Sequence, residues 1–91
     1  MDNQNNDINE PELLLRLSKG DEDAYNQIYN QYYADVLKLA QKFAKTPQQA
    51  QDLALGVFGK IWVNRHELPR VSSLVDYLFI TAYDYIRSET K

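Results

Sequence analysis

The chain contains no cysteine, which excludes disulfides, thiolate metal sites and cysteine nucleophiles. It has one histidine and only three glycines, none of them in a loop that could cradle phosphate. The sequence also offers no inward-facing carboxylate pair and no cluster with metal-ligand spacing. We therefore expect a protein that is not an enzyme, with no catalytic residues, no metal and no other cofactor.

Long apolar runs are also absent, since no stretch approaches the roughly 20 apolar residues needed to cross a bilayer. The first ten residues, MDNQNNDINE, have neither a basic start nor an apolar stretch and so lack the features of a secretory signal. We expect a cytoplasmic protein without a membrane partner. Because residues 1–10 are almost entirely polar, we expect them to form a disordered tail.

Positive charge is scarce in the first part of the chain. The formal net charge is −3, from 13 acidic and 10 basic side chains. Residues 1–35 hold eight acids and two bases, whereas residues 36–91 hold five acids and eight bases. The overall charge argues against strong nucleic-acid binding, but the second part could still face an anionic partner.

Helical signals dominate what is present. Pro11 suits the first position of a short helix that Gly20 ends, and Asp21 is a good N-cap for a second helix. Apolar residues then recur at three- and four-residue spacing for about five turns, which strongly indicates a helix. They are Tyr25, Ile28, Tyr29, Tyr32, Val36, Leu39, Ala40 and Phe43.

Two further helices follow. Thr46, a proline directly after it and Gln49 form a capping-box pattern that begins a third helix over about 47–66. Ser73 begins a fourth helix that continues to the C-terminus. No hairpin turn or strict alternation indicates a strand. The predicted fold is all-α, a compact bundle of three long helices plus a short N-terminal helix, over residues 11–91.

The third helix is apolar on two sides. Its core stripe is Ala50, Leu53, Ala54, Val57 and Ile61, flanked by Phe58. The opposite side includes Leu55, Val63 and two glycines, Gly56 and Gly59, each of which costs about 1 kcal/mol relative to alanine. We interpret this side as a shallow strip that another helix can approach closely. In the alternative interpretation, the short first helix covers the strip within the chain.

Four segments also match one family in order and separation. They are DEDAYNQIYNQYY at 21–33, QAQDL at 49–53, VFGKIW at 57–62 and SLVDYLFI at 73–80. These segments resemble region 2 of the extracytoplasmic-function sigma factors of bacterial RNA polymerase. The resemblance covers roughly residues 12–91, and several weak matches in register make it fairly specific.

The resemblance implies a transcription initiation domain that docks on the clamp helices of the polymerase β′ subunit. It also implies recognition and melting of the minus-ten promoter element through the non-template strand. The expected polymerase contacts are Asp52, Leu55, Gly56, Gly59, Trp62 and Val63. The expected DNA contacts are Arg65, His66, Arg70, Phe79, Tyr83, Arg87 and Lys91, with the loop from about Arg65 to Ser73 forming a base pocket. An anti-sigma factor is a further partner that the resemblance suggests.

The sequence departs from the family at two points. Leu55-Gly56 stands where the family commonly has Gln-Glu or Gln-Asp, and Tyr83-Asp84 stands where it often has Arg-Asn. Both departures favour an alternative function, a sigma-like protein-interaction module that does not bind DNA. The chain ends at Lys91, so the C-terminal helix-turn-helix domain of the family is absent from the expected organisation.

Overall fold

The computed structural model describes residues 10–91, and every regular element within them is a helix. The elements are α1 (Glu10–Ser18), α2 (Glu22–Gln41), α3 (Pro47–Val63), the 3-10 helix η2 (Arg65–Arg70) and α4 (Leu74–Glu89). The prediction of an all-α bundle is confirmed. The predicted tail lies outside the described residues except for Glu10, which begins α1 instead of ending the tail.

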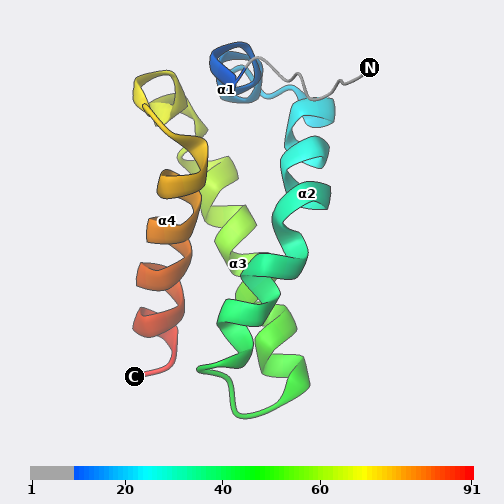
Figure 1. The fold of residues 1–91 in the computed structure, drawn as a ribbon, viewed down its shortest axis with the longest axis vertical. Coiled ribbons are helices and arrows are strands. Elements are labelled where there is room, and N and C mark those ends of the chain that lie inside the picture. The colour runs from blue at the N-terminus through cyan, green and yellow to red at the C-terminus, as the bar shows by residue number, and fades with distance from the viewer. Residues whose placement is uncertain (1–9) are drawn as a thin grey trace.

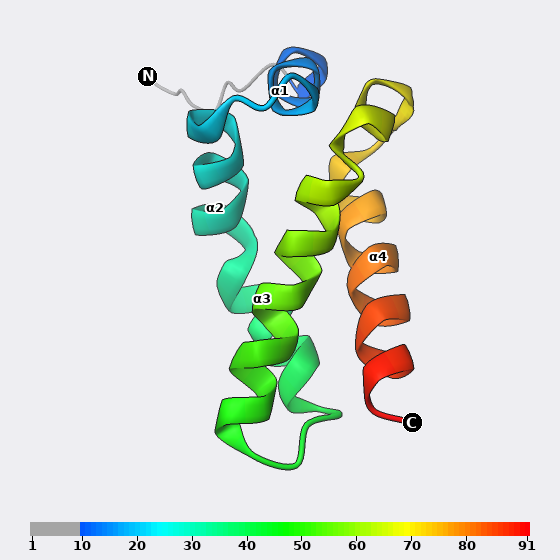
Figure 2. The same cartoon turned by 180° about the vertical axis from the view of Figure 1, so that it is seen from behind.

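The three long helices stand side by side, and α3 contacts both α2 and α4 (Figure 1). Seen from behind, α3 lies in front of its two neighbours (Figure 2). The short α1 crosses one end of the bundle, where it contacts η2 and α2. The predicted core stripe of α3 is buried, with Ala54, Val57, Phe58 and Ile61 fully inaccessible. This arrangement leaves one side of α3 without a neighbouring helix.

Side-chain caps begin the three long helices at the residues that the sequence predicts. Each cap accepts a hydrogen bond from the backbone N–H three residues on, which satisfies a donor that the helix itself leaves unpaired. The donor–acceptor distances are 3.1 Å for Asp21 to Ala24, 3.0 Å for Thr46 to Gln49 and 3.3 Å for Ser73 to Asp76. Gly20, at φ 87°, ends α1 in the left-handed conformation that glycine adopts without strain.

The segment after α3 is not the expected loop. The third helix ends at Val63, and η2 follows it with Leu68 completely buried. In an α-helix the ring of Pro69 would clash with the carbonyl four residues earlier, so the α-helix does not continue through this segment. Because α1 contacts η2 along this segment, Leu68 is part of the core. Residues 65–70 of the segment from Arg65 to Ser73 thus form a helix instead of the predicted loop, and the base pocket stays a prediction.

Polar contacts hold α1 at both of its ends. The Arg16 Nε donates to Asp21 Oδ2 at 2.9 Å, and this contact lowers the pKa of the Asp21 carboxyl and raises the pKa of Arg16. At the other end, Glu10 Oε2 accepts a hydrogen bond of 3.0 Å from the backbone N–H of Leu74. Helix α1 is thereby joined to the first residues of both α2 and α4.

Candidate functional site

The side of α3 that points away from the core is exposed and largely apolar. Leu55 keeps 51% of its surface accessible and Val63 keeps 70%, and Gly59 lies one turn from each of them. Asp52 continues this side toward the start of α3, where the Gln48 amide donates to Asp52 Oδ1 at 3.0 Å. We call Asp52, Leu55, Gly59 and Val63 the outer strip. The helix that carries it stands in front of its neighbours in Figure 2.

Within residues 10–91, α1 does not cover the outer strip. It lies across the end of the bundle, and its buried leucines Leu13, Leu14 and Leu17 join the core there. Leu55 and Val63 consequently remain exposed. The interpretation in which the first helix covers the strip does not describe this structure.

The prediction that Gly56 belongs to an open strip is wrong. A Cβ placed on Gly56 would lie 2.5 Å from Cζ of Tyr85 on α4, and closer still to the hydroxyl oxygen. Gly56 is half-buried, and the absence of a side chain there admits the Tyr85 ring into the contact between α3 and α4. This glycine is explained by packing inside the chain.

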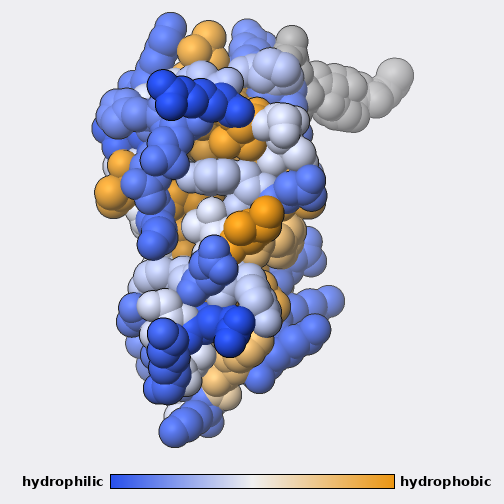
Figure 3. All heavy atoms as spheres, turned by 90° about the vertical axis from the view of Figure 1, so that its left-hand side faces the viewer, coloured by the Kyte–Doolittle hydropathy of each residue, from blue (hydrophilic) through white to orange (hydrophobic). Residues whose placement is uncertain are grey.

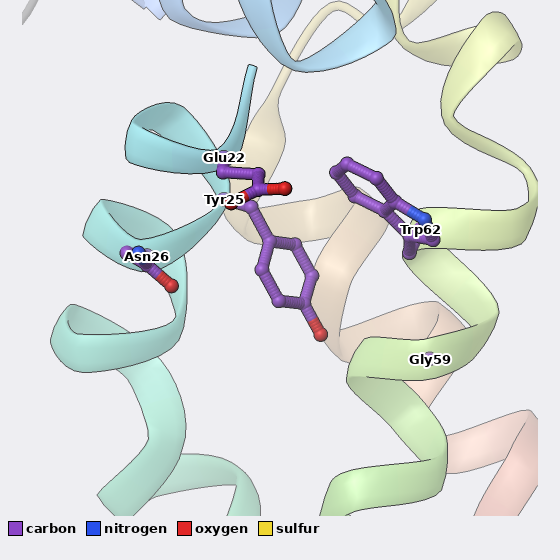
Figure 4. Close-up of a pocket in the computed structure, with 5 residues that line it drawn as sticks. All are labelled: Glu22, Tyr25, Asn26, Gly59 and Trp62. Carbon is purple, nitrogen blue, oxygen red and sulfur yellow. The ribbon is translucent and has the colours of Figure 1, made fainter. Parts of the chain in front are cut away.

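Gly59 has a different environment. A Cβ placed on it would have no neighbouring atom within 4 Å among residues 10–91. It lines a groove of about 320 Å³ between α2 and α3, together with Glu22, Tyr25, Asn26 and Trp62. Figure 4 shows Tyr25 and Trp62 projecting into the space between the two helices, beside the bare backbone of Gly59. We call this feature the Gly59 groove.

The aromatic walls of the Gly59 groove hold each other in place. The Tyr25 and Trp62 rings meet edge to face, with centroids 5.1 Å apart and planes at 70°. Burial raises the pKa of the Tyr25 phenol, as expected for a hydroxyl partly removed from water. Tyr25 also begins a row of rings that continues along α2 through Tyr29 and Tyr33. The groove therefore has walls of fixed orientation.

Arg65, predicted to contact DNA, is engaged within the chain. Its guanidinium carbon lies 4.5 Å from the Trp62 ring centroid, and its Nη1 donates to the Trp62 carbonyl oxygen at 2.9 Å. Its Nε is buried and has no hydrogen-bond partner among the described residues. The side chain supports Trp62 from behind and is only partly accessible to a ligand.

His66 and Arg70, the other predicted DNA contacts of this region, are exposed on η2. Both belong to a helix that the buried Leu68 fixes to the core, which gives them a defined position. Lys91 is exposed at the C-terminal end of the chain. The C-terminal end of the chain lies at the opposite end of the bundle from η2 (Figure 1).

The remaining predicted DNA contacts lie on the side of α4 where Phe79 meets Tyr32 and Tyr83 meets Phe43. Phe79 is half-buried against Tyr32, with ring centroids 6.4 Å apart, whereas Tyr83 is 43% exposed. The Arg87 guanidinium lies 5.4 Å from the Tyr83 centroid. A groove of about 510 Å³ runs along this face, lined by Asp76, Phe79, Ile80, Tyr83 and Asp84. Figure 3, seen from the α4 side, shows apolar side chains among hydrophilic ones.

Sequence reasoning missed the contribution of α2 to the candidate site. Glu22, Tyr25 and Asn26 line the Gly59 groove because the start of α2 lies opposite the end of α3. Two consecutive helices joined by a short connection usually pack antiparallel, and that rule would have placed Tyr25 near Trp62. Ile80, 63% exposed, was also missed, although it is the last residue of the SLVDYLFI segment that carries the resemblance.

Comparisons with protein-family models, with curated proteins and with solved structures found no match to this chain. Within residues 10–91, no group of three or more histidine or acidic side chains is placed to hold a metal ion. None of the described helices combines the length and apolar character that crossing a bilayer requires. The candidate site is thus defined by two exposed apolar surfaces, one on α3 and one on α4.

Proposed function

We propose that this chain is a transcription initiation domain that docks on RNA polymerase through the outer strip of α3. The observation that carries the proposal is the exposure of Leu55 and Val63 on either side of Gly59. Exposed apolar side chains in line on one helix, with a bare backbone between them, suit the side-by-side approach of another helix. From the segments that resemble sigma factor region 2, we infer that this other helix belongs to the clamp coiled coil of β′.

Docking on the polymerase would place the domain in the cytoplasm, where the enzyme works. Leu55 and Val63 give the contact apolar area, and removing such area from water contributes about 25 cal/mol per Å². Trp62, half-buried beside the strip, adds an aromatic edge of the kind often found at the centre of interfaces. The contact is therefore expected to be driven mainly by apolar burial.

A purified β′ clamp fragment tests the proposal. We expect the chain to co-elute with it, and we expect Leu55→Arg to abolish co-elution because a charge would be buried without a partner. Gln31→Arg, at an exposed position on α2, adds the same charge away from the strip and should leave binding unchanged. If both variants bind the clamp fragment as well as the unsubstituted chain does, the contact does not involve Leu55.

Promoter recognition is the second part of the proposal. Tyr83 offers an exposed ring on which a base could stack, with Arg87 beside it, and Arg70 offers a cation for the backbone. Asp76 and Asp84 line the same groove and repel phosphate. We therefore expect weak, salt-sensitive binding to a single-stranded minus-ten oligonucleotide, reduced by Arg70→Ala and by Tyr83→Ala.

The same two aspartates favour the second candidate function, a protein-interaction module that does not bind DNA. Asp76 and Asp84 place negative charge beside Phe79, Ile80 and Tyr83, an arrangement that suits a basic protein segment better than a nucleic acid. Oligonucleotide binding measured at low salt with the clamp fragment present separates the two functions. Absence of binding under those conditions favours the interaction module.

A further inference from the structure

No packing contact among residues 10–91 requires glycine at position 59. Glycine inside a helix costs about 0.5–1 kcal/mol relative to alanine, and a Cβ at Gly59 would meet nothing. Gly56, one turn earlier in α3, has a reason inside the chain, since Tyr85 fills the space beside it. Alanine at position 59 would therefore favour folding, and nothing within residues 10–91 explains the glycine.

We infer that the Gly59 groove receives one bulky apolar side chain from a partner α-helix, flanked on that helix by lysine or arginine. The inference rests on the proposed function insofar as the clamp coiled coil supplies the partner helix. It goes further in naming the chemistry that the partner presents and the place where it inserts.

The walls of the groove suit an apolar side chain. Tyr25 and Trp62 form an edge-to-face corner that is open on the side of Gly59. The volume of about 320 Å³ is at the lower end of the range for small-molecule sites, about 300–1,000 Å³, and fits one large side chain better than a cofactor. Because Arg65 stacks on Trp62 and donates to its carbonyl oxygen, the corner is held in position before binding.

The charges around the groove select a basic partner. Glu22 lines the groove, is exposed and has no cationic partner among residues 10–91. Asp52, at the start of the outer strip, accepts a hydrogen bond from the neutral Gln48 amide. An acidic group in the groove and another at the start of the outer strip complement cations that flank an apolar residue on a partner helix.

The geometry of α3 favours a helix as the occupant. Leu55 and Val63 lie one turn before and one turn after Gly59, so they flank the groove along the helix axis. Packed helices normally lie about 8–10 Å apart, depending on the side chains at the crossing point, and glycine permits the shorter distance. A partner side chain opposite Gly59 can then reach Tyr25 and Trp62 while its neighbours contact Leu55 and Val63.

The test is a substitution that fills the Gly59 groove with a side chain of the protein itself. Gly59→Leu places an apolar side chain where the partner's would go, and Lys60→Leu adds the same side chain at the next exposed position, off the strip. Two probes are titrated, the β′ clamp fragment and an amphipathic leucine–lysine peptide of about 18 residues, or five helical turns. A leucine–glutamate peptide of the same pattern is the control. Emission from Trp62, the single tryptophan, reports occupancy of the groove.

We expect both probes to change Trp62 emission and Gly59→Leu to weaken their binding at least about tenfold, while Lys60→Leu leaves it unchanged. Glu22→Lys should weaken both probes as well, and the leucine–glutamate peptide should not bind. Urea unfolding provides the folding control, because Gly59→Leu should be at least as stable as the unsubstituted chain.

The outcomes separate this inference from the proposed function. If Leu55→Arg abolishes clamp binding and Gly59→Leu leaves it unchanged, the inference about the Gly59 groove is wrong, whereas the proposal of polymerase docking is supported. Binding of the leucine–lysine peptide alone, sensitive to Gly59→Leu, supports the groove and contradicts the clamp as partner. If sedimentation finds a dimer that Gly59→Leu dissociates, a second copy is the occupant and the proposed partner is wrong.

Discussion

The ring of Tyr85 occupies the space that a side chain at Gly56 would need, so α3 and α4 meet through a glycine and an aromatic ring. Gly59, three residues later, faces open space. The two glycines that the sequence places on one side of α3 therefore have different roles in the structure. One permits a contact within the bundle, and the other leaves a groove on its surface.

Alanine substitution should affect stability in opposite directions at the two positions. Gly56→Ala forces Tyr85 out of its contact, and overpacking of this kind costs about 1–3 kcal/mol, more than the helix gains from alanine. Gly59→Ala should raise the free energy of unfolding by about 0.5–1 kcal/mol. Urea unfolding measures both. With Tyr85→Ala already present, Gly56→Ala should become stabilising; a stabilising Gly56→Ala in the unsubstituted chain would contradict the contact.

Glu10 is expected to stabilise α4 from a distance. Its carboxylate accepts a hydrogen bond from the Leu74 N–H at the positive end of the α4 dipole. Glu10→Ala should lower the free energy of unfolding by about 0.5–2 kcal/mol, the range for loss of an N-terminal cap. Glu89→Ala, at the exposed last turn of α4, is the matched control. Similar unfolding curves for the two variants would show that the Glu10 contact contributes nothing.

The contact between Arg16 and Asp21 predicts a pH dependence. The guanidinium lowers the pKa of Asp21 in the folded state below its ordinary value of 3.8. The resulting stabilisation is complete above that ordinary value and is lost as pH falls through the lower folded-state pKa. Asp21→Asn keeps a good N-cap but removes the charge. Its urea midpoint should lie below that of the unsubstituted chain at neutral pH, and the difference should shrink in strong acid.

Asp35→Asn, at an exposed position in the middle of α2, is the control for this pH series. It removes the same charge without an arginine partner among the described residues. Its midpoint should stay close to that of the unsubstituted chain across the series. A difference for Asp21→Asn that stays constant from neutral pH to strong acid would exclude the ion pair as its cause.

Leu68 should be among the residues on which stability depends most. It is fully buried in η2 beneath α1, and leucine-to-alanine substitution in a core costs about 2–5 kcal/mol. Leu15→Ala, on the exposed side of α1, should change stability by only about 0.5 kcal/mol or less. Urea unfolding of both variants checks the prediction. A small loss for Leu68→Ala would mean that α1 and η2 do not share the core.

The sequence was sufficient for the three long helices and their starts. Asp21, Thr46 and Ser73 act through their own side chains on the next turn of backbone, so local chemistry identifies them. The buried stripe of α3 could be predicted because its apolar residues recur at helical spacing. Polymerase docking and DNA binding, including the roles given to Trp62 and Arg70, stay predictions.

Properties that depend on contacts between distant residues could not be predicted. Nothing local to Gly56 indicates that Tyr85, on another helix, will lie against it. Arg65 has the sequence context of a free surface cation, and only the position of the Trp62 ring shows that it is engaged. Leu68 precedes a proline and is expected in a loop until α1 is placed above it. Each case depends on how helices pack, which a single helix does not reveal.

The row of tyrosine rings on α2 ends at Trp62 on α3, so the intrinsic fluorescence of the chain reports on the contact between these two helices. Neighbouring centroids from Tyr33 through Tyr29 and Tyr25 to Trp62 are 5.1, 6.4 and 5.1 Å apart, distances at which excitation energy passes from phenol to indole. Light absorbed by these tyrosines should therefore emerge as tryptophan emission while α2 and α3 stay together. Any event that separates the two helices should restore tyrosine emission, without a dye or a label.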